Sequence, residues 1–234
     1  VEPSAPNRVY AATRGDGVLR SEDYGETWSK PNRGKRGPGK VKCVTIDPHD
    51  SRRIYAGCEP IDLFVSEDEG KSWDRLDAIW DIPFIKTISY PVATVEPHLR
   101  DLTVDPTDPD ILYAALQVGY MVKSTDRGKS WKLLDENLDC DVHTIVIDPT
   151  DPSHLFIATG GNGARSGNAP GRALYISKNA GDSWTPAAMN FTEEYSVPIP
   201  LDPTDPKRMY SAVANGPPGG WRRPCPRPVG CFWS

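Results

Sequence analysis

The chain has 234 residues, of which 38% are hydrophobic and 25% charged, as in an ordinary globular protein. Its formal net charge of −5 disfavours nucleic acid as a partner, and no apolar run reaches the roughly 18–20 residues that span a membrane. The 24 prolines and 20 glycines indicate frequent turns rather than long helices.

A pattern of the form Ser-x-Asp/Asn-x-Gly-x-Thr/Ser-Trp recurs four times, and we call it the Ser-x-Asp turn. Its copies are 21–28, 66–73, 124–131 and 177–184, and their third residues are Asp23, Asp68, Asp126 and Asn179. Glycine permits a left-handed backbone, while the carboxylate or amide oxygen and the hydroxyls tie the turn. We therefore expect these four residues to be structural. The tryptophans, Trp28, Trp73, Trp131 and Trp184, are expected in equivalent buried positions.

A second pattern, Asp-Pro followed by another Asp, alternates with the first. Its copies begin at Asp47, Asp105, Asp148 and Asp202, and each precedes a short apolar run. Proline fixes φ and the carboxylates accept nearby backbone N–H groups, so this pattern is typical of a tight turn between two antiparallel strands.

The two patterns together predict an all-β chain of four-stranded blades. In chain order, 8–12 matches the second strand of a blade, and the clearest full blade has strands at 142–147, 155–159, 173–177 and from Trp184 onward. A repeat of roughly 40–50 residues is typical of propeller blades. The expected blades are 1–39, 40–97, 98–140 and 141–194, with a partial fifth at 195–234. About four and a half blades predict a fragment of a larger closed ring.

These two motifs resemble those of the Asp-box, or BNR-repeat, β-propellers, a superfamily that includes sialidases, xyloglucanases, sortilin-like receptors and the photosystem II assembly factor. The resemblance covers nearly the whole chain and implies a sialidase-like propeller fold. It implies a carbohydrate-active, glycoside hydrolase-like protein, or one that binds carbohydrates or anions through the loops opposite the Ser-x-Asp turns. The alternative is a non-catalytic scaffold that binds another protein, so the resemblance leaves open whether the chain is an enzyme. It favours a secreted or periplasmic location.

Counting back from the Asp that ends each first strand gives a register for the opposite loop face. Five positions before it are Lys42, Arg100, His143 and Val197, and seven before it are Lys40, His98, Asp141 and Tyr195. With period-two alternation these positions share one side of the strand, and the residues that follow them are apolar. A polar mouth above an apolar wall is typical of a ligand pocket. The expected ligand-binding set is Arg14, Lys42, His98, Arg100, His143, Trp221 and Arg223, for a polysaccharide or an anionic small molecule.

A glycosidase needs two carboxylates about 5–10 Å apart. The catalytic candidates are Glu59, Asp101, Asp141 and Glu194, with Tyr195 as the nucleophile in a sialidase-type site, although the Arg-Ile-Pro motif of sialidases is absent. The sequence requires no cofactor. A divalent cation is a second hypothesis, because His98 and Asp101 on one expected blade and Asp141 and His143 on the next offer imidazole and carboxylate ligands. Solvated rim charges and hydrogen-bonded surface histidines remain the alternative for each of these residues.

Overall fold

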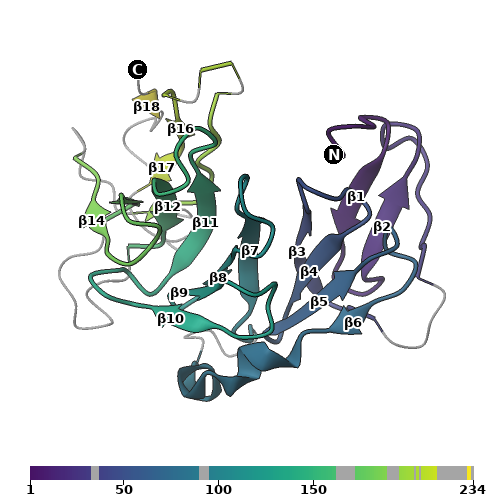
Figure 1. The fold of residues 1–234 in the computed structure, drawn as a ribbon, viewed down its shortest axis with the longest axis horizontal. Coiled ribbons are helices and arrows are strands. Elements are labelled where there is room, and N and C mark those ends of the chain that lie inside the picture. The colour runs from purple at the N-terminus through teal and green to yellow at the C-terminus, as the bar shows by residue number, and fades with distance from the viewer. Residues whose placement is uncertain are drawn as a thin grey trace, which may run out of the picture. The chain divides into compact units, whose positions relative to one another are not determined.

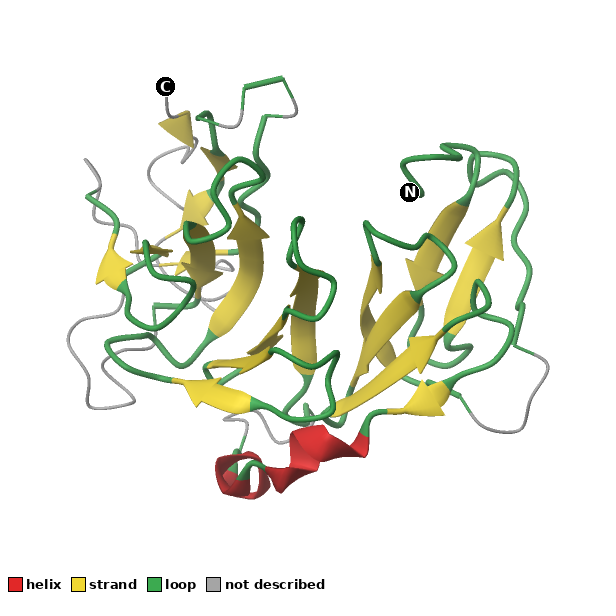
Figure 2. Ribbon diagram, in the orientation of Figure 1, coloured by secondary structure: helices red, strands yellow, loops and turns green. Residues whose placement is uncertain are grey.

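The computed structural model describes residues 1–32, 37–89, 95–161, 172–188, 195–202, 204–205, 207–214 and 231–232 (Figure 1). Within these ranges the regular structure is almost entirely β, as predicted (Figure 2). The exceptions are two 3-10 helices between β6 (Asp74–Arg75) and β7 (Leu99–Val104), namely η1 (Asp77–Asp81) and η2 (Pro83–Thr87). They were not predicted, because two five-residue helices are too short to show a helical periodicity. No helix of the described ranges has the length and hydropathy of a membrane span.

Three four-stranded sheets follow one another along the chain, each built from consecutive strands. We number them second, third and fourth, because the two-stranded sheet of β1 and β2 precedes them in the chain. The second sheet is β3 (Val41–Ile46), β4 (Ile54–Cys58), β5 (Asp62–Ser66) and β6 (Asp74–Arg75). The third is β7 (Leu99–Val104), β8 (Leu112–Leu116), β9 (Met121–Ser124) and β10 (Lys132–Leu134). The fourth is β11 (Val142–Ile147), β12 (Leu155–Thr159), β13 (Leu174–Ser177) and β14 (Thr185–Pro186). This is the strand order expected for propeller blades.

The two ends of the chain carry two-stranded pairs. At the N-terminal end β1 (Val9–Ala12) pairs with β2 (Val18–Ser21). Towards the C-terminal end β15 (Tyr195–Ser196) pairs with β17 (Val213–Ala214), and β16 (Tyr210–Ser211) pairs with β18 (Cys231–Phe232).

The chain divides into two compact units, and the division passes through the third sheet. Unit 1 is Val1–Ala114 with Lys123–Lys132, and unit 2 is Ala115–Val122 with Leu133–Ser234. Each has an apolar core of its own. In unit 1 the core contains Tyr10, Val18, Val41, Ile54, Ala56, Cys58 and Trp73. In unit 2 it contains Ala158, Ala173, Leu174, Ile199 and Val213.

The Ser-x-Asp turns are closed by their own side chains, as the second copy shows. The Asp68 Oδ1 atom accepts hydrogen bonds from the Ser66 hydroxyl and the Ser72 amide, both at 2.8 Å, and its Oδ2 accepts the Ser72 hydroxyl at 2.7 Å. The Gly70 amide donates to the Ser66 hydroxyl at 2.8 Å. Both Glu69 and Gly70 are left-handed, with φ of 62° and 85°. Equivalent bonds recur around Asp23, Asp126 and Asn179.

We expect Asp68→Ala to lower the free energy of unfolding by about 1–2 kcal/mol, the usual cost of losing a capping side chain. Asp68→Asn is the matched control, because asparagine occupies this position in the fourth turn. Urea unfolding followed by circular dichroism measures both. Burial opposes ionisation of Asp68, but the bonds from Ser72 and Ser66 hold its pKa below the ordinary value.

Because the folded-state pKa of Asp68 is lowered, its contribution is present above the unfolded pKa and is lost as pH falls through the folded one. The difference between wild type and Asp68→Ala should therefore shrink in acid. An equal loss of stability in the alanine and asparagine variants would contradict the role of the oxygen bonds in the turn.

The tryptophans of the four turns are not equally buried, so the predicted equivalence is wrong for one of them. Trp73 and Trp184 are 7% and 2% exposed, and Trp131 is partly buried. Trp28 is 43% exposed.

In the second and third turns a side chain from the preceding repeat covers the turn glycine. Pro31 Cγ lies 3.4 Å from the point where a Cβ would stand if Gly70 had a side chain. Leu76 Cδ1 lies 2.9 Å from the same point at Gly128. Both covering residues stand three positions after the tryptophan of the repeat before. At Gly25 the ring of its own tryptophan is the sole group within 4 Å among the described residues. Among the residues that the structure describes, the first turn therefore has no covering side chain from another repeat.

Candidate functional site

The predicted ligand side of the second sheet is the end opposite its turns. The Asp-Pro turn follows β3 and the Ser-x-Asp turn follows β5, so both lie at one end of the sheet. Lys40 precedes β3 and Glu59 follows β4, which places both at the other end. In this sheet the turns and the candidate residues Lys40 and Glu59 therefore lie at opposite ends, as expected.

At this end a carboxylate is buried between two lysines. The Glu59 side chain is fully buried, and its two oxygens accept hydrogen bonds from the Lys40 ammonium at 2.5 Å and the Lys42 ammonium at 3.0 Å. The Glu59 amide also donates to the Lys40 carbonyl at 2.9 Å. Burial would raise the pKa of Glu59, but the two lysines lower it to about 2. Glu59 is therefore an ionised counter-ion at neutral pH.

Lys42 occupies a β-bulge. Val41 pairs with Cys58 and Cys43 pairs with Gly57, so Lys42 is the extra residue on its strand. A bulge redirects a side chain and is frequent beside functional sites. Strict alternation along the strand groups Lys42 and Lys40 in the sequence, and the bulge shows that this reason is wrong. The two lysines nevertheless lie on the same side, because both bind the Glu59 carboxylate.

His98 and Arg100 come from the third sheet but belong to the same unit. The Ile61 amide, next to the Glu59 loop, donates to the Pro97 carbonyl at 2.9 Å and so fixes the start of this segment. His98 is buried, and its Nδ1 lies 2.9 Å from the Glu96 carbonyl. Burial lowers the pKa of His98 to about 4, and the charges of Lys42 and Arg100 act in the same direction.

The imidazole of His98 is consequently neutral at pH 7. A carbonyl oxygen can only accept, so Nδ1 carries the proton and Nε2 bears the lone pair. We call Lys40, Lys42, Glu59, His98 and Arg100 the Glu59 cluster.

Unit 2 holds a second polar group, at the corresponding position of β11, the first strand of the fourth sheet. His143 is again a bulge residue, and its side chain is fully buried. Its Nδ1 lies 2.6 Å from the Ser196 carbonyl, and its Nε2 lies 3.4 Å from the Asp141 carboxylate. The Tyr195 ring packs edge-on at 5.0 Å between centroids. Asp139, also buried, accepts the Asp141 amide at 3.0 Å. Sequence reasoning missed Asp139, although two acids flanking Cys140 were a visible signal.

The remaining candidates are dispersed. Arg14 is exposed in the connection between β1 and β2. Asp101 is half-buried, and its carboxylate accepts the Leu102 amide at 2.9 Å. Glu194, Trp221 and Arg223 lie outside the described residues.

The cation hypothesis finds no assembled ligand set. Across the described ranges, no group of three or more His, Cys, Asp or Glu side chains is placed to hold a metal ion. His98 and Asp101 belong to unit 1, whereas Asp141 and His143 belong to unit 2.

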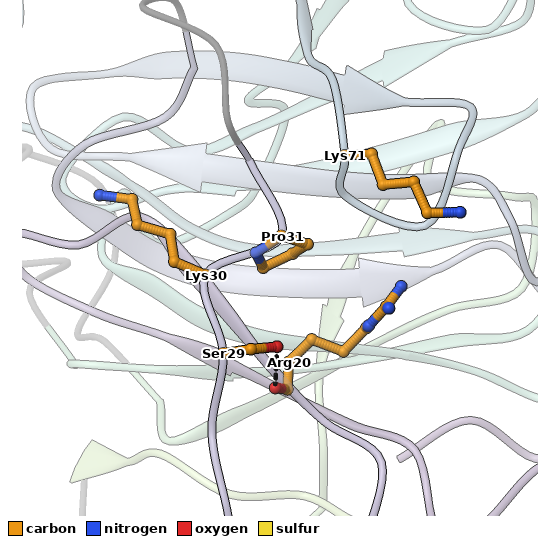
Figure 3. A pocket seen from close by; sticks show the side chains of 5 residues that line it. All are labelled: Arg20, Ser29, Lys30, Pro31 and Lys71. Carbon is orange, nitrogen blue, oxygen red and sulfur yellow. Dashed lines mark hydrogen bonds between the residues drawn. The ribbon is translucent and has the colours of Figure 1, made fainter.

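A hollow of about 440 Å³ lies at the opposite end of unit 1, beside the Ser-x-Asp turns. It is lined by Arg20, Ser29, Lys30, Pro31 and Lys71. Figure 3 shows the Lys30 ammonium pointing away from the other two cations. Arg20 pairs with Glu22 at 2.9 Å and with Glu69 at 3.2 Å, and Lys71 contacts Glu69 at 3.3 Å, so both cations have acidic partners.

Comparison with known proteins identifies partial relatives. No family model matches the chain. It is 33% identical over 81 residues to a protein named "Probable oligoxyloglucan-reducing end-specific xyloglucanase" from Neosartorya fischeri, covering 32% of this chain and 10% of that protein. It is 30% identical over 156 residues to xyloglucanase Xgh74A of Acetivibrio thermocellus, covering 56% and 18%. The chain thus spans between a tenth and a fifth of these two relatives.

Solved structures establish the fold. An ancestral GH74 enzyme superposes with a TM-score of 0.69 at 19% identity, covering 93% of this chain and 27% of that structure. The GH74 xyloglucanase of Xanthomonas campestris gives 0.65 at 16% identity, covering 99% and 34%. YCF48 from Cyanidioschyzon merolae gives 0.56 at 18% identity, covering 91% and 62%. The chain has the β-propeller fold of these proteins, as predicted, with four-stranded sheets as blades.

Proposed function

We propose that this chain is a carbohydrate-active β-propeller that binds a sugar through the Glu59 cluster. The observation that carries the proposal is the Glu59 carboxylate, fully buried while two half-buried lysines bond to its two oxygens. Burying a charge is costly unless it is paired and hydrogen-bonded. Here the pairing also holds two ammonium groups in fixed positions at the end of the sheet, as a preorganised binding site requires. The named relatives, which are xyloglucanases, support carbohydrate as the ligand class.

We infer that Glu59 serves in binding rather than in proton transfer, and its ionised state supports this. A glycosidase acid must hold a proton near neutral pH, which requires a raised pKa. The pKa of Glu59 is instead lowered to about 2. Among the catalytic candidates in the described ranges, Asp141 is buried, and so is its neighbour Asp139. The proposal concerns sugar binding and not sugar hydrolysis.

Binding is tested by calorimetric titration with two probes, xyloglucan heptasaccharide and trigalacturonate. Lys42→Ala should weaken binding of whichever sugar binds by about tenfold, because one charge-assisted hydrogen bond contributes about 1.5 kcal/mol. Arg100→Ala should weaken it by a similar factor. Arg52→Ala is the matched control, since Arg52 is exposed in the Asp-Pro turn at the other end of the sheet.

Circular dichroism and urea unfolding check that each variant is folded. If neither sugar binds the wild type, or if Lys42→Ala and Arg52→Ala behave alike, the proposal fails. The protein-binding scaffold then becomes the better description.

A further inference from the structure

The hollow beside the Ser-x-Asp turns joins the first repeat to the second. Its lining residues 29–31 follow the first turn, whereas Lys71 belongs to the second turn. Pro31 packs against Gly70, the residue before Lys71, with its Cγ 3.4 Å from the point where a Cβ would stand. The volume of about 440 Å³ lies within the range of roughly 300–1,000 Å³ that is usual for small-molecule sites. The hollow is therefore large enough for a small ligand.

Arg20 forms a fixed wall of this hollow. Its amide donates to the Ser29 carbonyl and its carbonyl accepts the Ser29 amide, both at 2.9 Å. Its guanidinium lies 2.9 Å from the Glu22 carboxylate, and its Nη1 donates to the Glu69 carboxylate at 3.2 Å and to the Glu69 carbonyl at 3.3 Å. The side chain is 16% exposed. A wall that is already held in place loses little entropy when a ligand binds, as a preorganised site requires.

The ion pairs around the hollow balance one another. Among the described residues, four cations pair with four acids: Arg8, Arg20, Lys30 and Lys71 with Glu2, Glu22, Glu69 and Asp16. A neutral surrounding gives an anion little attraction, and the whole chain has a net charge of −5, which repels anions. These charges favour an uncharged ligand.

The two lysines offer hydrogen-bond donors to such a ligand. An ammonium group has three N–H donors. Lys71 donates to the Glu69 carboxylate at 3.3 Å, which uses one of them. Lys30 lies 3.8 Å from Asp16, which is beyond hydrogen-bond distance. Their side chains are 58% and 49% exposed, so both ammonium groups are open to a ligand from solvent.

Ser29 and Pro31 add an acceptor and an apolar surface. The Ser29 hydroxyl donates to the Arg20 carbonyl at 3.1 Å, so its oxygen keeps lone pairs that can accept. Figure 3 shows the Pro31 ring between Lys30 and Lys71. A sugar carries hydroxyl groups that both accept and donate, and the C–H groups of its ring pack on apolar surfaces. The lining of the hollow complements all three features.

We propose that this hollow is a second carbohydrate-binding site, selective for a neutral sugar. The hydroxyl groups of the sugar bind Lys30, Lys71 and Ser29, while its ring packs on Pro31. This inference goes beyond the proposed function, because the hollow lies at the turn end of unit 1 and the Glu59 cluster at the other end of the second sheet. The ligand class follows from the charges and donors of the hollow itself.

The test is a titration of the ¹⁵N-labelled wild type and Lys42→Ala with xyloglucan heptasaccharide, followed by NMR. Lys42→Ala weakens the Glu59 cluster, so saturable shift changes at the amides of Ser29, Lys30 and Lys71 should persist in it. Lys71→Met keeps the apolar stem but removes the donors, and should weaken binding at these amides about tenfold, the effect of one charge-assisted hydrogen bond. Raising NaCl from about 50 to about 300 mM should change the affinity less than about twofold, because the ligand has no charge to screen.

Lys129→Met is the matched control, because Lys129 holds the position of Lys71 in the third Ser-x-Asp turn. It should leave the affinity at the hollow unchanged. Circular dichroism checks that each variant is folded. Equal affinity of wild type and a folded Lys71→Met, or equal losses in Lys71→Met and Lys129→Met, would overturn the role of the hollow.

Two charged probes, trigalacturonate and inorganic phosphate, test the ligand class. If either shifts the amides of the hollow and the heptasaccharide does not, the neutral ligand is wrong. If no probe shifts them, the hollow is not a site, and binding that is lost in Lys42→Ala but kept in Lys71→Met then supports the Glu59 cluster alone. Binding that is kept in Lys42→Ala and lost in Lys71→Met supports the hollow and contradicts the proposed role of the Glu59 cluster.

Discussion

Trp184→Ala is expected to lower the free energy of unfolding by about 3–5 kcal/mol, the usual cost of emptying a buried aromatic site. Trp184 is 2% exposed, so its ring is fully packed in the fourth sheet's turn. The same substitution at Trp28 is expected to cost less than about 1 kcal/mol, because a side chain that is 43% exposed leaves little cavity and loses little buried area. The two residues hold the same position in the same motif.

Guanidinium unfolding curves, recorded by circular dichroism, measure both changes. The slope of each curve should match that of the wild type, so that the change reflects stability rather than a different unfolded state. A third variant, Trp73→Ala, serves as a control in unit 1 and should resemble Trp184→Ala. Similar losses at Trp28 and Trp184 would contradict the burial difference on which the prediction depends.

Glu59→Gln is expected to destabilise the protein by about 2–3 kcal/mol at pH 7. The substitution keeps the shape of the side chain but removes the charge that two lysines bind. A fall in pKa from 4.5 to about 2 corresponds to a stabilisation of about 3 kcal/mol, which is an upper value because the lysines are partly exposed to solvent.

The pH dependence follows from the direction of that shift. Because the folded-state pKa of Glu59 is lowered, its stabilising contribution is full above pH 4.5 and is lost as pH falls towards 2. The difference in stability between wild type and Glu59→Gln should therefore be constant from pH 7 to pH 5 and shrink in more acidic buffer. Urea unfolding at a series of pH values measures it.

Glu67→Gln is the matched control, since Glu67 is 55% exposed and pairs with Arg53 at the surface. Surface pairs of this kind contribute about 0–1 kcal/mol. If Glu59→Gln and Glu67→Gln cost the same, the carboxylate of Glu59 is not the counter-ion that the geometry indicates.

The repeats and their turns could be read directly from the residues. A Ser-x-Asp turn is closed by bonds among residues at most four positions apart, such as Ser66, Asp68 and Ser72. Such short-range chemistry is complete within the motif, so each copy predicts its own conformation. The turns also mark where strands stop, so the same pattern predicts the order of the strands. It also predicts that Glu59 lies at the end of the second sheet opposite the turns.

Other features depended on contacts between distant residues. The bulge at Lys42 depends on the pairing of its strand with β4. The sequence offers Glu59 as a catalytic candidate because nothing local shows its two lysine partners, which are 17 and 19 residues away. The exposure of Trp28 depends on whether another repeat covers it, which the motif cannot encode. Burial and pKa are set by all the groups that surround a side chain, so they are decided when the strands pack and not before.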